Sequence, residues 1–252
     1  MPLAIAIILF LVWTLVTFIM EGRIRTLLRP EAKRARLAYA VVANMLIGTA
    51  GAMLAIYLIM KVSDGTSAAT SAATYGFAPL GRTLVSIVVG LALGSLIFAL
   101  QRPPSWNMTV LLNGYSQTLV VSIAEVLVCW SVLGASFTTT VSGLGAVPSI
   151  LAGLLLSALA FGLYHFAHSP PFNTVRLVLV LSVVGLVTGT FFFVSRDVYG
   201  TILFHNFLAL KGVTQALADT GRLGSFEKRQ NQLLLTAAVS VLLLVVLDLI
   251  LF

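Results

Sequence analysis

Three ionisable side chains lie inside otherwise apolar stretches of the sequence and are of the types that acid–base chemistry needs. Glu125 lies in SIAEVLVCW, His165 lies in SALAFGLYHFAHSPP, and His205 opens HNFLAL. A carboxylate and imidazoles held together could take a proton from a water molecule and later return it. One glutamate and two histidines from three helices therefore predict a site that activates water inside a membrane.

These residues stand out because an ionisable group at the centre of a bilayer costs about 2.5–3.5 kcal/mol on insertion scales. The other acid in an apolar span is Asp248, which lies near the C-terminus and can reach the membrane interface. His168 lies one turn after His165, at the expected end of the same span. Taken singly, each of these histidines, like Glu125, could instead be a satisfied structural residue. Their occurrence together favours a functional site.

The composition shows what must position these side chains. The chain has 252 residues, of which 59% are hydrophobic and only 9% are charged, with a mean hydropathy of +1.06. Soluble domains carry about 25% charged residues, and a chain of this size could not bury so much apolar surface in water. A single cysteine, Cys129, excludes a disulfide scaffold. We expect an all-α, polytopic membrane helical bundle.

About eight segments are apolar and long enough to be membrane spans, since a helix needs about 20 residues to cross the hydrocarbon core. The seventh is short, and residues 134–148 after the fourth are expected to form an uncharged loop. The predicted spans are 2–20, 37–60, 83–100, 109–133, 150–168, 175–194, 201–211 and 233–252.

Basic residues indicate the orientation, because they favour the cytoplasmic side of short loops. Six of the fifteen lie in residues 21–36, and placing that segment inside puts twelve inside and three outside. Both termini are then outside. The net charge of +7 is thereby explained by topology, and we expect no nucleic-acid partner. The basic segment could also bind anionic lipid headgroups.

The residues above resemble the CPBP intramembrane proteases, which include the type II CAAX prenyl endopeptidases. The family pattern is Glu-Glu-x-x-x-Arg, then Phe-x-x-x-His, then His-x-x-x-Asn or Asp. The second motif is intact as Phe161-Gly-Leu-Tyr-His165, and VVGLVTGTFFFVSRDVYGTILFHNF resembles the approach to the third. The resemblance covers about residues 113–209.

The first and third motifs are degenerate. In the register that aligns best, Ala124 and Glu125 take the two Glu positions and Cys129 takes that of Arg; in a register shifted by one residue, Glu125 is the first Glu and Trp130 replaces Arg. Ala209 stands where the third motif has Asn or Asp. Asn206 is adjacent to His205 but faces another direction on a regular helix.

The resemblance implies hydrolysis of a peptide bond within the membrane. Glu125 and His165 would polarise a water molecule, and His205 would hold the developing oxyanion. The expected partners are the lipid bilayer and a membrane-associated protein or peptide substrate. A divalent metal such as zinc is compatible with a Glu, His, His set, but the sequence does not require one.

Three alternatives remain open at the level of sequence. The chain could be a catalytically inactive CPBP-like protein that binds or protects a partner, which the degenerate motifs favour. It could be a zinc-dependent membrane lipid hydrolase, although that constellation needs a mid-span Asp. A transporter is the third, without an inverted repeat to support it.

The predicted organisation has three parts. Residues 1–105 form N-terminal transmembrane helices with the basic cytoplasmic loop, 106–212 form a CPBP-like core that carries the polar site, and 213–252 hold a polar connection and the last transmembrane helix. We expect an integral, multi-pass protein in the plasma membrane of a prokaryote.

Overall fold

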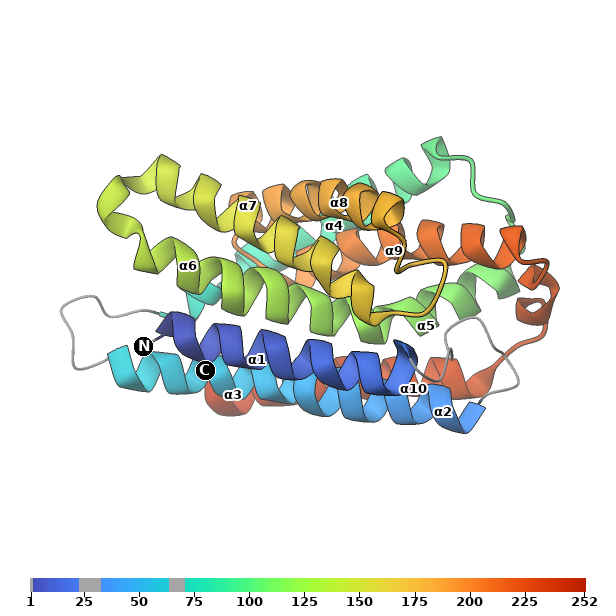
Figure 1. Cartoon of the computed structure of the whole chain (residues 1–252), viewed down its shortest axis with the longest axis horizontal. Helices are drawn as coiled ribbons and strands as arrows, with labels where there is room; N and C mark the ends of the chain where they lie inside the picture. The colour runs from blue at the N-terminus through green and yellow to red at the C-terminus, as the bar shows by residue number, and fades with distance from the viewer. Residues whose placement is uncertain (1, 23–32, 64–70) are drawn as a thin grey trace.

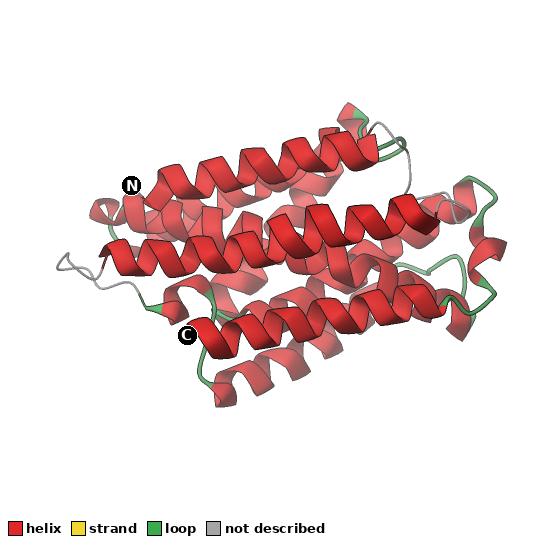
Figure 2. Cartoon of the chain, turned by 90° about the horizontal axis from the view of Figure 1, so that it is seen from below, coloured by secondary structure: helices red, strands yellow, loops and turns green. Residues whose placement is uncertain are grey.

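The computed structural model describes residues 2–22, 33–63 and 71–252 (Figure 1). Within these residues every regular element is a helix (Figure 2). Helices are the expected solution, because each satisfies its own backbone hydrogen bonds where no water is available. The predicted all-α polytopic bundle is confirmed.

Seven helices of the described chain are long and apolar enough to cross a membrane. The first three spans are α1 (Pro2–Thr17) with its extension η1 (Phe18–Gly22), the continuous run α2 (Lys33–Ala38), η2 (Tyr39–Gly51) and α3 (Ala52–Ser63), and α4 (Leu80–Leu100). The fourth is the run α5 (Met108–Glu125), η4 (Val126–Gly134) and α6 (Ala135–Thr140). The others are α7 (Ala146–Tyr164), α8 (Val175–Ser195) and α10 (Asn231–Leu251).

The seventh predicted segment corresponds to α9 (Val198–Asp219), which has 22 residues and is far longer than the expected 201–211. It falls outside the seven apolar helices because buried polar side chains such as His205, Asn206 and Thr214 interrupt its hydropathy. Both chain ends lie at the same end of the bundle (Figure 1), as an even number of crossings requires. Counting α9, the described residues form eight long helical segments.

The predicted loop over residues 134–148 is wrong for most of its length. Helix α6 continues to Thr140, only a short 3-10 turn (Ser142–Leu144) follows, and α7 begins at Ala146. Ser and Thr can extend a helix when their hydroxyls bond backward to the preceding turn. Thr139 and Thr140 both donate to the carbonyl of Ser136.

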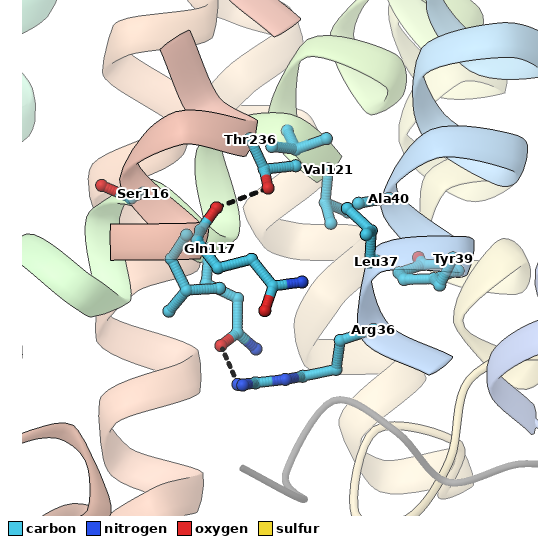
Figure 3. A pocket seen from close by; sticks show the side chains of 11 residues that line it. Arg36, Leu37, Tyr39, Ala40, Ser116, Gln117, Val121 and Thr236 are labelled. Atoms are coloured by element: carbon cyan, nitrogen blue, oxygen red, sulfur yellow. Dashed lines mark hydrogen bonds between the residues drawn. The ribbon is translucent and has the colours of Figure 1, made fainter. Parts of the chain in front are cut away.

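The second span also begins earlier than expected, at Lys33, so part of the predicted basic loop is helical. Arg36 is buried and folds against the bundle, where its Nη1 donates to Gln117 Oε1 at 3.4 Å (Figure 3). Its Nη2 donates to Gln230 Oε1 at 3.1 Å. These bonds join α2, α5 and the segment before α10. Arg23, Arg25 and Arg29 lie outside the described residues.

Small residues let the helices approach closely around the site. A Cβ at Gly90 of α4 would lie 2.3 Å from the carbonyl oxygen of Gly200 in α9, so the two backbones touch. A Cβ at Gly48 of η2 would lie 2.4 Å from the Cβ of Ala124. Close backbone contact of this kind is how helices associate in lipid. The run α5–η4–α6 is the central, almost wholly buried span.

Candidate active site

The three predicted site residues lie on three separate elements and converge. Glu125 is the last residue of α5, His165 opens a 3-10 turn (His165–Ala167) directly after α7, and His205 lies in the middle of α9. All three are buried, with exposures of 4%, 7% and 1%. Glu125 and His205 are 80 residues apart in the sequence but lie together in the structure.

Glu125 and His205 form the shortest contact of the site. The Nε2 of His205 lies 2.9 Å from Glu125 Oε2, and its Nδ1 lies 2.8 Å from the hydroxyl of Thr188 in α8. A carboxylate only accepts, so Nε2–H donates to it and Nδ1 accepts the hydrogen of Thr188. The chain Thr188–His205–Glu125 thus fixes one tautomer and one orientation of the ring.

His165 approaches the other carboxylate oxygen. Its Nδ1 lies 2.8 Å from the carbonyl oxygen of Phe161, one helical turn earlier, and must donate because a carbonyl only accepts. In the neutral ring the lone pair is then on Nε2, which lies 3.8 Å from Glu125 Oε1. Two acceptors at this distance can both accept from one molecule that lies beside them.

His168 belongs to the same cluster, although the sequence placed it at an interface. It is 4% exposed, and its ring stacks on that of His165 with centroids 4.9 Å apart and planes at 21°. One ligand atom from each of Glu125, His165 and His168 can be chosen so that all lie within 4.8 Å of one another. The donor set is one that could hold a metal ion.

Aromatic side chains enclose the cluster and exclude water from its back. The ring of Trp130 lies 5.3 Å from that of His205 and 5.0 Å from that of Phe161. Phe161 also meets the rings of His165 and His205 edge to face, at 4.7 and 5.2 Å. In such surroundings electrostatic interactions are stronger than in water.

On its open side the cluster faces a cavity of about 300 Å³. Apolar side chains make most of its wall, among them Val180 and Val184 of α8 and Leu208 of α9. Gln101, directly after α4, and Lys211 of α9 also line it. The cavity therefore extends from the buried carboxylate to polar side chains of α9 and of the residue after α4.

The neighbours of Glu125 indicate which of the two alignments of the first motif fits the structure. Ala124 packs against Gly48 of η2 and does not line the cavity, whereas Glu125 faces the histidines. The register with Glu125 as the first Glu therefore matches the geometry, and Trp130 then occupies the Arg position. Cys129 is buried in the apolar core.

In the structure, the third motif still differs from the family pattern. Ala209 lines the cavity where the family has Asn or Asp. Asn206 points to α5 instead, accepting from Ser122 at 3.0 Å and donating to the carbonyl of Tyr115 at 3.1 Å. It ties two helices together and does not replace the missing side chain.

Asp248 lies apart from this cluster, at the opposite end of the bundle. It is half-buried and accepts a hydrogen bond of 2.6 Å from the hydroxyl of Tyr199. This contact agrees with the structural role that we expect for Asp248.

Thr188 is the site residue that the sequence analysis missed. A threonine in VVGLVTGTFFF carries no distinguishing signal, because its neighbour Thr190 has the same type and bonds only to its own helix. His168 had a signal in its spacing of three residues from His165.

Residues 107–210 match the family model described as type II CAAX prenyl endopeptidase Rce1-like. No curated protein and no solved structure matches the chain. The matched residues hold Glu125, both histidine motifs and most of the cavity lining, and they span less than half of the chain. Over residues 107–210 the predicted resemblance to the CPBP family is therefore confirmed.

Proposed function

We propose that this protein is an intramembrane peptidase that hydrolyses a peptide bond of a membrane-associated protein or peptide. The observation that carries the proposal is the gap of 3.8 Å between Glu125 Oε1 and His165 Nε2 at the floor of the cavity. A water molecule beside this pair, on the side of the cavity, would donate one hydrogen to each acceptor and turn its oxygen lone pairs toward the cavity. The family match over these residues supports the same chemistry.

The reaction would begin when the water oxygen attacks the carbonyl carbon of a peptide bond in the cavity. Its proton passes to Glu125, and the carbonyl π electrons move to oxygen, which gives a tetrahedral intermediate. The intermediate collapses, the carbon–nitrogen bond breaks, and Glu125 returns the proton to the leaving amine. General acid–base catalysis of this kind contributes about 10²–10⁴-fold to the rate.

His205 would act in two successive ways. In the structure its Nε2–H holds the carboxylate of Glu125 in place. Once Glu125 has taken a proton, its negative charge is gone and the hydrogen bond weakens, so that Nε2–H can turn to the oxyanion. One donor to an oxyanion is worth about 2.7–4 kcal/mol.

The position of the cavity limits the substrate. Its walls are mainly apolar, while Gln101 and Lys211 stand at the predicted cytoplasmic end. We therefore place the scissile bond in a segment that enters from that surface and is partly embedded in lipid.

The test compares new peptide termini in membranes that contain wild-type protein, Glu125→Gln or Asp248→Asn, at equal folded amounts. Asp248→Asn is the matched control, because it neutralises the other acid of a span at the far end of the bundle. Termini that appear with wild type and Asp248→Asn but not with Glu125→Gln are the expected result.

Identical termini in all three membranes, with each protein stable in detergent, would contradict the peptidase. Ala209 and Trp130 at polar positions of the family pattern then favour an inactive relative that binds or shields a membrane partner. In that case Glu125→Gln leaves the biological function intact.

A further inference from the structure

We propose that a cavity at one end of the bundle binds the headgroup phosphate of an anionic phospholipid through Arg82 and Arg196. The cavity has a volume of about 440 Å³ and shares no lining residue with the cavity of the candidate active site. The inference concerns lipid binding, so it does not depend on the proposed peptidase.

The cavity lies where several membrane helices begin or end. Arg82 is in the first turn of α4, and Arg196 directly follows α8. Thr139 is in the last turn of α6, and Ala146 begins α7. The turn between α6 and α7 lies at the end of the bundle that holds both chain termini (Figure 1). The ends of membrane spans lie at the level of the lipid headgroups, so the cavity is within reach of a phospholipid phosphate.

Positive charge at this end of the bundle is an exception to the charge distribution of the chain. The predicted orientation leaves three basic residues on the side of the termini, namely Lys61, Arg82 and Arg196. Two of these three line the same cavity. The positive-inside rule places basic residues on the opposite side and gives no reason for this pair, whereas an anionic ligand does.

The two arginines form no ion pair with any residue that the structure describes. Asp197, which follows Arg196 in the sequence, is fully buried, and its two oxygens accept from Thr83 Oγ1 at 2.6 Å and from the N–H of Gly200 at 2.7 Å. The lining of the cavity contains no acid among the described residues. Burial lowers the pKa of Arg196, and no described carboxylate opposes this effect. A partly buried cation without a counter-charge is costly, so a bound anion would stabilise it.

The backbone and a neighbouring ring position the side chain of Arg196. The residue has a left-handed conformation, with φ 53° and ψ 42°, and its N–H donates to the carbonyl of Phe192 at 2.8 Å. Its guanidinium lies over the ring of Phe193, 5.3 Å from the centroid. Glycine is the usual residue in this conformation at the end of a helix, so the backbone does not explain an arginine here.

The donors around the cavity suit a phosphate. A guanidinium presents paired N–H groups in a planar fork that matches the oxygens of a phosphate. Ser71 and Thr74, on the turn before α4, add two hydroxyls that make no side-chain hydrogen bond with a described residue. The first turn of α7 adds backbone N–H groups and the positive end of a helix dipole. Its N-cap, Gly145, has no side chain that could accept from these groups.

A phospholipid fits the surroundings of the cavity better than a free ion does. Ile150 lines the cavity in the second turn of α7. From there Leu151, Leu155 and Leu159 form an exposed apolar face along the same helix. A lipid can place its phosphate in the cavity while its acyl chains follow this face. The choline of phosphatidylcholine would bring a third cation to the two arginines, so an anionic lipid is expected.

The test is lipid binding to the full chain, purified in detergent and stripped of lipid, by native mass spectrometry and thermal unfolding. The probes are phosphatidylglycerol, phosphatidylcholine with the same acyl chains, and inorganic phosphate. The variants are Arg82→Gln and Arg196→Gly, since glycine readily adopts the backbone conformation of residue 196. The matched control is Arg176→Gln, which removes one exposed positive charge at the other end of α8.

Wild type and Arg176→Gln should bind phosphatidylglycerol in preference to phosphatidylcholine and should melt at a higher temperature with it. Arg82→Gln should weaken this binding about fivefold, the effect of one basic residue near a membrane surface. Arg196→Gly should weaken it by about tenfold or more, because hydrogen bonds to charged groups are stronger when they are partly buried. Any phosphatidylglycerol that the basic segment 21–36 holds should remain bound in both variants.

Phosphatidylcholine that binds as tightly as phosphatidylglycerol, or arginine variants that bind as wild type does, would overturn the proposal. An equal loss in Arg176→Gln would also overturn it, by showing a general effect of net charge. Inorganic phosphate that raises the melting temperature as much as the lipid would replace the lipid by a free anion. A less stable Arg196→Gly protein with unchanged lipid binding would limit Arg196 to stabilising the end of α8.

Discussion

Replacing Thr188 by valine tests whether His205 is positioned through its far nitrogen. Thr188 is fully buried, and its hydroxyl lies 2.8 Å from His205 Nδ1. Valine keeps the shape of the side chain but removes the hydrogen bond. The substitution leaves a buried nitrogen without its partner, at a cost of about 1–3 kcal/mol, and no longer fixes the tautomer that donates to Glu125.

If that cost falls on the transition state, the rate of peptide cleavage decreases by about 5- to 150-fold, because each 1.36 kcal/mol is a factor of ten. The assay follows the initial rate at which the peptide terminus found with wild-type membranes appears, at equal folded amounts. Thr188→Ser keeps a hydroxyl and should stay close to the wild-type rate. Nitrogen-15 spectra of the His205 ring report the tautomer independently of activity.

The matched control is Thr190→Val on the same helix. Thr190 is exposed and its hydroxyl bonds only to the carbonyl of Leu186, at 2.8 Å, so we expect no change in rate. A Thr188→Val protein that cleaves as fast as wild type with an unchanged tautomer would refute the role of the Thr188–His205–Glu125 chain. Equal losses in both variants would point to a general effect on α8.

Other predictions concern specificity of the site, packing and topology. Ala209→Asn places the family's amide in the cavity and should raise the cleavage rate without changing the melting temperature; a slower enzyme would contradict the alignment of the third motif. Gly90→Ala should lower stability by about 1–3 kcal/mol through overpacking, because its Cβ would meet the backbone of α9, whereas Gly81→Ala, with open space around it, should not; thermal unfolding in detergent measures both. An impermeant maleimide should label Ser142→Cys on intact cells and Lys228→Cys only after permeabilisation, and the reverse pattern would invert the predicted orientation.

The sequence determined the class of the fold and most of its spans. Apolar runs of about 20 residues between charged or proline-containing segments leave few alternatives to helices in a bilayer. Where boundaries were wrong, the local pattern was ambiguous: the Ser/Thr/Gly stretch after residue 133 extends a helix because its hydroxyls bond backward. In α9, His205 and Asn206 masked a full-length helix because hydropathy counts them as polar, although the bundle buries them.

The sequence also singled out Glu125, His165 and His205 as candidates, since ionisable residues in apolar spans are rare and costly. Only the tertiary structure decided how they lie relative to one another. The 100° turn between successive residues of α5 turns Ala124 toward η2 and Glu125 toward the histidines, and no pattern within one helix shows which direction faces the cavity. Thr188 and His168 joined the site because α8 and the turn after α7 are packed beside it. Such contacts between distant segments are settled by packing, not by local sequence.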